Sequence, residues 1–267
     1  MSPELVRAVL DRLGLERPRP DLDGLERLYR AWGEAVPFDN VQKLLHLSEG
    51  RSGPLPGSDA RSFFSAWLEH RTGGTCWAGN GALHDLLAAL GFEVERAAAT
   101  MMPAPDTPGP NHGSVVVRLD GERWIVDASI LSGRPLRIPR PDEPVDPAAP
   151  LPRVERMGGT FAVVWRTLRA PGGFPCRFDR IGVGAAEWDA LHQRTAACGP
   201  FNHALSARVN RGPLSLGWAT GVRFELDAAG RLATQPRDRA GRDRFLVEEL
   251  GVTPDLVARL PDDRPTP

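Results

Sequence analysis

The sequence of 267 residues is poor in several residue types, and each shortage excludes a class of protein. Its three cysteines, Cys76, Cys176 and Cys198, are an odd number without CxxC spacing, so neither a disulfide framework nor a metal site is predicted. Basic and acidic residues nearly cancel, 33 against 34, which argues against a nucleic-acid partner or a membrane surface. No apolar run approaches the ~18 residues of a membrane span. Because the N-terminus also lacks the apolar stretch of a signal peptide, we expect a cytoplasmic protein.

The composition that is present is that of a globular protein with a substantial core. Hydrophobic residues make up 41% of the chain, which is ordinary for such proteins. The length exceeds that of a typical single core, so we expect one large unit or two to three packed subdomains.

Hydrophobic periodicity divides the chain into a helical part followed by a strand-rich part. Helical spacing runs through residues 2–13, 23–32, 58–68 and 76–90, and Gly91 supplies a stop for the last of these. Short β-branched or aromatic runs then predict strands at 94–101, 114–119, 123–127, 160–168, 214–220 and 222–226. The proline-rich segment 139–152 predicts an extended connection, and short helices are expected at 245–250 and 254–260. Helices followed by strands and then mixed structure indicate the α+β class.

Cys76 is the first candidate for chemistry. It stands at the predicted start of a helix, shortly after Gly73 and Gly74. The N–H groups and dipole at a helix N-terminus stabilise a thiolate, and glycines allow a substrate to approach the backbone closely. By itself the segment fits a small buried cysteine at least as well, because that is the commoner place for a free thiol.

A hairpin places a base and a carboxylate close together. If Asp120-Gly121 forms a two-residue turn, Ser129 lies opposite His112, and Asp127 lies two residues away on the same face. The imidazole and the carboxylate can then meet, as a general base and the group that fixes its tautomer must. The alternative is a solvated hairpin that carries two polar residues.

The other five histidines lack an acidic partner at a position that the predicted structure defines. His84 stands next to Asp85, but adjacent helical residues are not expected to face each other. His112 is therefore the preferred base.

These residues resemble the nucleophile motif and triad of the arylamine N-acetyltransferase family. Gly73, Gly74, Cys76 and Asn80 match the nucleophile motif, and His112 falls at the place of the family histidine. The spacing from His112 to Asp127 also suits the family. Three further stretches are similar to family elements and follow the same order along the chain: 36–40, 199–201 and 245–252.

The resemblance implies a cysteine-proteinase-like fold of three domains. They would be an N-terminal helical bundle carrying the nucleophile (1–90), a β-barrel carrying the histidine and aspartate (91–195), and an α/β lid (196–267). The implied catalytic residues are Cys76, His112 and Asp127. The implied substrate-binding residues are Phe38, Gly74, Thr75, Trp77, Gly113, Ser129 and Phe201.

The implied activity is ping-pong N-acyl transfer from acetyl-CoA or another acyl thioester, through an acyl-cysteine, to an aromatic amine or similar nucleophile. The thioester is a co-substrate; no permanently bound cofactor and no metal is expected. The expected partners are these small molecules, with no nucleic acid and no membrane, and the chain is expected to be a monomer or a homodimer.

The sequence departs from the family pattern at Thr72, Ala78 and residues 128–131, which leaves three alternatives open. One is an amide synthase that takes a polyketide or peptidyl thioester from an acyl carrier protein. Another is a Cys-His-Asp hydrolase or transglutaminase-like protein, and the third is a non-catalytic relative that only binds ligands or partners.

Overall fold

The computed structural model describes residues 1–102, 106–168 and 170–265. Five helices occupy most of the first ninety residues: α1 (Pro3–Leu13), α2 (Leu22–Ala35), α3 (Val41–Ser48), α4 (Ala60–His70) and α5 (Cys76–Leu90). Side chains that accept backbone N–H groups begin three of these helices, at Ser2, Asp21 and Asp59. None of the helices in the described residues is long and apolar enough to cross a membrane.

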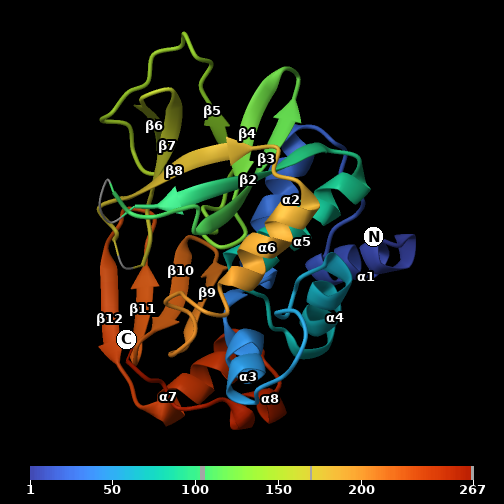
Figure 1. Cartoon of the computed structure of the whole chain (residues 1–267), viewed down its shortest axis with the longest axis vertical. Coiled ribbons are helices and arrows are strands. Elements are labelled where there is room, and N and C mark those ends of the chain that lie inside the picture. Colours follow the sequence, from blue (N-terminus) through green and yellow to red (C-terminus); the bar gives the residue numbers. More distant parts are fainter. Residues whose placement is uncertain (103–105, 169, 266–267) are drawn as a thin grey trace.

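A barrel-like antiparallel sheet of seven strands follows the helices (Figure 1). Its spatial order is β5-β4-β3-β2-β8-β7-β6. Most neighbouring strands in this sheet are therefore also consecutive in the chain, and only β2 and β8 are not. The strands are β2 (Glu93–Met101), β3 (His112–Leu119), β4 (Glu122–Val126), β5 (Leu136–Ile138), β6 (Arg153–Met157), β7 (Thr160–Trp165) and β8 (Phe174–Ile181). Helix α6 (Ala185–Arg194) follows this sheet and contacts α5.

A second sheet of five strands joins the N-terminal part of the chain to the C-terminal part. Its order is β1-β9-β10-β11-β12, so the two-residue strand β1 (Phe38–Asp39) pairs with a strand some 170 residues later in the chain, Phe38 lying opposite Arg208. The other strands are β9 (Ser206–Arg211), β10 (Leu214–Ala219), β11 (Val222–Leu226) and β12 (Leu232–Pro236). Three short helical segments then close the chain below this sheet: α7 (Arg239–Arg244), the π-helical turn η1 (Phe245–Glu249) and α8 (Pro254–Arg259) (Figure 1).

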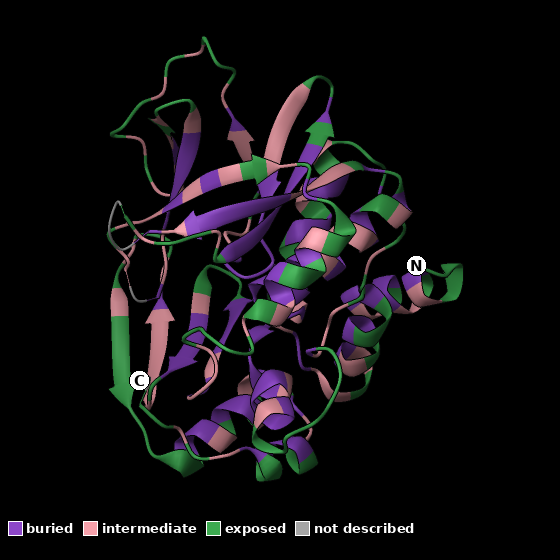
Figure 2. Cartoon of the chain, viewed as in Figure 1, coloured by how far each residue is buried: buried purple, intermediate pink, exposed green. Residues whose placement is uncertain are grey.

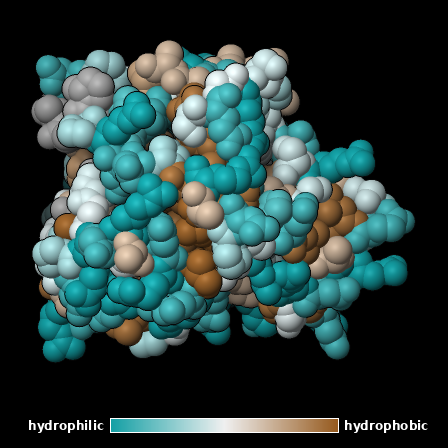
Figure 3. All heavy atoms as spheres, turned by 90° about the horizontal axis from the view of Figure 1, so that it is seen from below, coloured by the Kyte–Doolittle hydropathy of each residue, from teal (hydrophilic) through white to brown (hydrophobic). Residues whose placement is uncertain are grey.

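Buried side chains gather between these layers, and the exposed positions lie on the outer helix faces and loops (Figure 2). The largest apolar cluster joins α1, α2, α4 and α5 to one face of β3 and β4, where Val115, Val117 and Val126 are fully buried. A second cluster packs α3 and the closing helices against β9 and β10. Seen from below, the molecule is mostly hydrophilic, with hydrophobic side chains visible in a strip near the middle and in a second patch on the right (Figure 3).

The α+β class and most of the long elements agree with the sequence predictions. Helix α5 runs from Cys76 to Leu90 and ends at Gly91, as predicted, and the turn at Asp120-Gly121 joins β3 to β4 with Leu119 opposite Glu122. Nine elements were not predicted: α3, α6, α7, β1, β5, β6, β8, β9 and β12. Most of these are short or rich in charged residues, and tertiary pairing holds them in place where periodicity gives no signal.

Candidate active site

The loop before α5 is fastened to β1, and this places Cys76 at the helix start. One carboxylate oxygen of Asp39 accepts the N–H of Gly73 at 2.6 Å, and the other accepts the N–H of Val41 at 3.0 Å. A Cβ atom on Gly73 would lie 1.8 Å from the carbonyl oxygen of Pro37, so only glycine permits this approach. Burial raises the pKa of Asp39 to about 6, although the same two N–H groups act in the opposite direction.

The first turn of α5 is left without a side-chain cap. Thr75 is the N-cap residue, and its side chain makes no capping hydrogen bond. The first N–H groups of an α-helix have no intrahelical acceptor, so they are available to a negative charge that develops beside Cys76. The thiol itself is 7% exposed.

The hairpin has the predicted register, but its ladder is shorter than predicted. Pairing between β3 and β4 runs from Leu119 and Glu122 to Val115 and Val126, and there it ends. The expectation that Ser129 lies opposite His112 is therefore wrong, since His112 pairs with Ala99 of β2 and the chain turns after Val126. The backbone turn that follows Val126 brings the side chain of Asp127 to His112.

His112 and Asp127 form a buried ion pair. The Nε2 atom of His112 lies 2.7 Å from Oδ2 of Asp127, and their side chains are 6% and 0% exposed. Burial acts to lower the pKa of His112, but the Asp127 charge and hydrogen bond, with a smaller contribution from the Cys76 side chain, hold it well above its ordinary value. Burial acts to raise the pKa of Asp127, but His112 holds it well below its ordinary value. Cys76 lines the same cleft as His112, and its side chain acts to raise the pKa of His112, so the three residues form one cluster.

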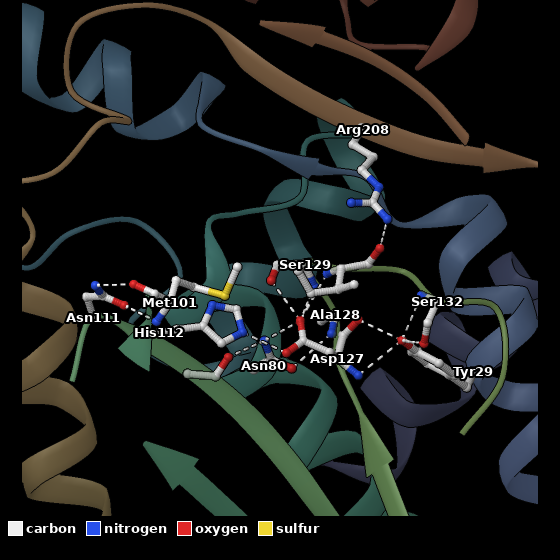
Figure 4. Close-up of polar contacts among 12 residues, drawn as sticks. Tyr29, Asn80, Met101, Asn111, His112, Asp127, Ala128, Ser129, Ser132 and Arg208 are labelled. Carbon is white, nitrogen blue, oxygen red and sulfur yellow. Dashed lines mark hydrogen bonds and ion pairs between the residues drawn. The ribbon is translucent and has the colours of Figure 1, made fainter. Parts of the chain in front are cut away.

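The second carboxylate oxygen of Asp127 is occupied by its own turn (Figure 4). Oδ1 accepts the hydroxyl of Ser129 at 2.7 Å and the N–H groups of Ser129 and Ile130 at 2.9 and 3.0 Å. This saturates the carboxylate and fixes its plane toward the imidazole.

Two further residues hold this turn and were not among the predicted site residues. The hydroxyl of Tyr29, the only tyrosine of the chain, donates to the carbonyl oxygen of Asp127 at 2.9 Å and accepts the N–H of Asp127 at 3.1 Å. Asn80 donates to the carbonyl oxygen of Gly113 at 2.7 Å and accepts the N–H of Ala128 at 2.9 Å, so it ties α5 to both β3 and the turn. Asn80 was visible as part of the sequence motif, whereas no local pattern identifies Tyr29.

The ion pair predicts a defined dependence of stability on pH. The raised pKa of His112 gives stability that is fully present below its unfolded value of 6.5 and lost as the pH rises through the folded value. The lowered pKa of Asp127 gives stability that is fully present above its unfolded value of 3.8 and lost as the pH falls through the folded value. Both contributions are fully present between pH 3.8 and pH 6.5. Asp127→Asn should therefore lower the free energy of unfolding most in this range, by roughly 3 kcal/mol. Urea unfolding of both proteins from pH 4 to 9 measures the difference, and a difference that grows steadily toward pH 9 contradicts it.

Cys76 and His112 open onto a cleft of about 390 Å³ between the two sheets. Most of its lining is apolar, and the rings of Phe38 and Phe201 meet edge to face with centroids 5.2 Å apart. The cleft is bounded by residues of β1, the α5 start, β2, β3 and the residue before it, the 129–130 turn, residues 167–168, the β8 start, the 200–201 loop, β9 and β10: Phe38, Cys76, Met101, Asn111, His112, Ser129, Ile130, Thr167, Leu168, Phe174, Pro200, Phe201, Ser206, Ala207, Arg208, Trp218 and Ala219. This volume and lining suit a small aromatic ligand.

The predicted substrate-binding residues separate into two groups. Phe38, Ser129 and Phe201 line the cleft together with Cys76 and His112, whereas Asp127 does not line it. Gly74, Thr75, Trp77 and Gly113 are not in its lining either. Trp77 packs edge to face on Trp188 with ring centroids 4.8 Å apart.

Gly113 is confined by these two tryptophans, which predicts the effect of a substitution. A Cβ atom there would lie 2.5 Å from the ring of Trp188 and 2.8 Å from that of Trp77. Gly113→Ala should lower the free energy of unfolding by roughly 1–3 kcal/mol, because both rings are buried and cannot retreat. Thermal unfolding measures this against Gly159→Ala, where a Cβ atom has no neighbour within 4 Å. Equal melting temperatures for the two variants would show that the tryptophans repack freely.

The remaining histidines and cysteines lie outside the cleft. The expectation for His84 is wrong, because its Nδ1 lies 2.8 Å from Oδ1 of Asp85, which also binds Arg96. All three cysteines are free; Cys176 is buried and Cys198 is exposed. The described residues contain no group of three or more histidine, cysteine or acidic side chains arranged to hold a metal ion.

Comparison with known proteins agrees with the family expected from the sequence. A family model described as N-acetyltransferase matches residues 21–161, more than half of the chain. An arylamine N-acetyltransferase of Mycolicibacterium smegmatis is 37% identical over 125 residues, which cover 44% of this chain and 43% of that protein. One from Mycobacterium tuberculosis H37Rv is 32% identical over 93 residues, or 34% and 31% of the two chains. These matches span less than half the length of the curated relatives.

Solved structures extend the likeness of fold to nearly the whole chain. A Mycobacterium smegmatis arylamine N-acetyltransferase structure superposes with a TM-score of 0.80 at 24% identity, covering 97% of this chain and 98% of that one. The Mycobacterium marinum enzyme in complex with CoA gives a TM-score of 0.77 at 20% identity, covering 96% and 98%. The predicted fold is confirmed.

Proposed function

Because this chain belongs to the N-acetyltransferase family, we propose that it transfers an acetyl group from acetyl-CoA to an aromatic amine through a thioester on Cys76. In this proposal Cys76 is the nucleophile, His112 is the proton carrier, and Asp127 orients and charges the imidazole. The observation that carries it is the buried His112–Asp127 pair, with His112 and Cys76 both lining an aromatic cleft. The CoA complex of the Mycobacterium marinum fold relative supports a CoA thioester as donor.

The first half-reaction acylates Cys76. The high pKa of His112 keeps the ring protonated beside the sulfur, which favours a thiolate paired with an imidazolium. The thiolate attacks the thioester carbonyl carbon, and the oxyanion that forms is stabilised by the free N–H groups of the first turn of α5. The bond from carbon to the CoA sulfur then breaks, and CoA leaves as a thiol with the proton of His112.

The second half-reaction returns the enzyme to its starting state. The amine nitrogen attacks the acyl-cysteine carbonyl, and neutral His112 accepts the proton that the nitrogen loses. The bond between carbon and the Cys76 sulfur breaks, which releases the amide and restores the thiolate beside the imidazolium. Asp127 stays ionised throughout, because its pKa lies well below its ordinary value.

The substrate-binding residues take different roles in this scheme. Phe38 and Phe201 would hold the aromatic ring of the amine, and Ser129 would lie at the edge of the acyl site. Gly74, Thr75, Trp77 and Gly113 would act by placing the backbone around Cys76, because they lie outside the lining.

The division into domains at 90/91 and 195/196 and the cellular location belong to the same proposal. The order of helices, large sheet and smaller sheet supports the division. An enzyme that works through a free thiolate needs a reducing compartment, which supports the cytoplasm.

Intact-mass spectrometry after incubation with acetyl-CoA and no amine tests the proposal. The expected result is one added acetyl group on Cys76, which disappears when an aromatic amine is supplied. The comparisons do not favour the amide synthase or the hydrolase, and the same experiment separates them from the proposal. Acylation only by a carrier-bound thioester would identify an amide synthase, and rapid loss of the acyl group to water would identify a hydrolase.

A further inference from the structure

Arg208 is a buried cation in the wall of the cleft. The residue is 8% exposed and comes from the middle of β9. It is the one arginine or lysine among the described residues that line the cleft, and no aspartate or glutamate lines it. A buried charge is costly unless an opposite charge or several hydrogen bonds compensate it.

The partners of Arg208 are neutral. Its Nε donates to the hydroxyl of Ser215 at 3.0 Å, and Nη2 donates to the carbonyl oxygen of Ile130. No hydrogen bond or ion pair joins Nη1 to any described residue. Asp127 acts on the charge of Arg208 only at a distance, because the carboxylate oxygens of Asp127 are bound by His112 and by its own turn. This turn lies between Asp127 and Arg208 in the close-up (Figure 4).

The charge of Arg208 persists in spite of this burial. Burial lowers the pKa of Arg208 to about 10, while the nearby Tyr29 and Asp127 act to raise it. The guanidinium is therefore protonated at neutral pH. A cation in this state lacks a contacting anion within the described chain.

The register of the small sheet places this cation beside the aromatic part of the cleft. Arg208 lies directly opposite Phe38 in the β1–β9 pair, and directly opposed residues project to the same face of a sheet. The ring of Phe38 in turn contacts Phe201. An aromatic ring held by these phenylalanines therefore has a guanidinium within the same cavity.

We propose that Arg208 binds a carboxylate carried by a substrate in this cleft, so that the enzyme selects a carboxylated aromatic amine or a carboxylated acyl group. The inference rests on the proposed acyl transfer and names the substrate class of the same site. A carboxylate would accept a charge-assisted hydrogen bond from Nη1 and supply the missing counter-charge. Arg208 also borders a neighbouring hollow of about 320 Å³, so the test must locate the carboxylate in the cleft.

The acceptor arm compares two amines of the same shape. The ratio of kcat/KM for 4-aminobenzoate to that for 4-aminobenzamide should fall roughly 10- to 100-fold in Arg208→Gln, the range expected for a lost hydrogen bond between charged groups. Arg208→Lys should recover part of the ratio, and Arg231→Gln, at an exposed arginine, should match the wild type. Because only an amine at Cys76 is acetylated, a change in this ratio places the carboxylate in the cleft.

The donor arm measures acylation of Cys76 by malonyl-CoA and by acetyl-CoA with no amine present. If Arg208→Gln loses acylation by malonyl-CoA selectively, the carboxylate belongs to the acyl group. If the ratio of malonyl-CoA to acetyl-CoA acylation is unchanged while the ratio of 4-aminobenzoate to 4-aminobenzamide falls, the carboxylate belongs to the amine. If neither ratio changes, the proposal is overturned. A parallel fall for all substrates would make Arg208 a support of the 127–130 turn, and a rise confined to the KM of acetyl-CoA would make it a contact of CoA.

A binding measurement separates this inference from the proposed function. Calorimetric titration of the wild type and Arg208→Gln with 4-aminobenzoate and 4-aminobenzamide needs no turnover. Should Cys76 accept no acetyl group at all, acyl transfer fails, while preferential binding of the carboxylate by the wild type would still support the role of Arg208. Equal binding of the two compounds to the wild type would overturn that role.

Discussion

Cys76→Ala should abolish acetyl transfer and leave the protein folded. No other described cysteine lies in the cleft, so nothing replaces the sulfur as the atom that receives the acyl group. Loss of a covalent nucleophile removes the thioester intermediate altogether, and we expect a fall in kcat of roughly 10⁴-fold or more. The fold should survive, because alanine is a good helix former and keeps the small apolar contacts of a side chain at the start of α5.

Steady-state acetylation and circular dichroism, measured on the same preparation, test this expectation. Cys198→Ala is the matched control, since it removes an exposed thiol near the cleft loop and should retain full activity. Turnover by Cys76→Ala at a rate near that of the wild type would refute the acyl-cysteine scheme. Loss of the circular dichroism signal would instead assign Cys76 a structural role, and Cys76→Ser would then be the variant to measure.

Asp127→Asn should lower kcat/KM by roughly 10²- to 10⁴-fold. The carboxylate accepts a hydrogen bond from Nε2 of His112, so it fixes the orientation of the ring and favours the imidazolium. An asparagine that keeps the turn would either present its NH₂ group to Nε2 or accept from it without charge. In both cases the paired thiolate and imidazolium become less favourable, although the distances barely change.

The pH dependence of the rate distinguishes this role from a loss of structure. A charge that supports the imidazolium should, when removed, shift the upper limb of the rate profile toward lower pH, because the ring then loses its proton at lower pH, whereas general destabilisation lowers the profile evenly. Asp85→Asn provides a matched control, because Asp85 also pairs with a histidine but lies outside the cleft. A normal rate in Asp127→Asn would exclude Asp127 from the catalytic residues.

Local patterns in the sequence predicted a large part of the fold and the residues at the centre of the candidate site. The helix that begins at Cys76 follows from its apolar spacing and its glycine stop, and the turn at Asp120-Gly121 fixed the register of β3 and β4. That register brought His112 and Asp127 near each other even though the ladder ends at Val126. The partner of His84 was misjudged, because backbone spacing does not determine how a short acidic side chain rotates.

Contacts between segments far apart in the chain could not be predicted from the sequence. Tyr29 supports a turn 98 residues away, Asn80 joins a helix to a strand and a turn, and Arg208 reaches the cleft through pairing with Phe38. None of these contacts produces a periodic pattern, because each depends on how whole layers pack.

The sequence by itself therefore determined the family and predicted the nucleophile, the base and the carboxylate, since helix starts, tight turns and motif spacing are properties of neighbouring residues. Only the tertiary structure decided which predicted residues line the cleft and that an arginine without a contacting anion stands among them. The physical reason is that burial and electrostatic pairing are set by residues brought together in space. The same local motif can thus carry different acyl groups and amines, according to the walls that distant strands build around it.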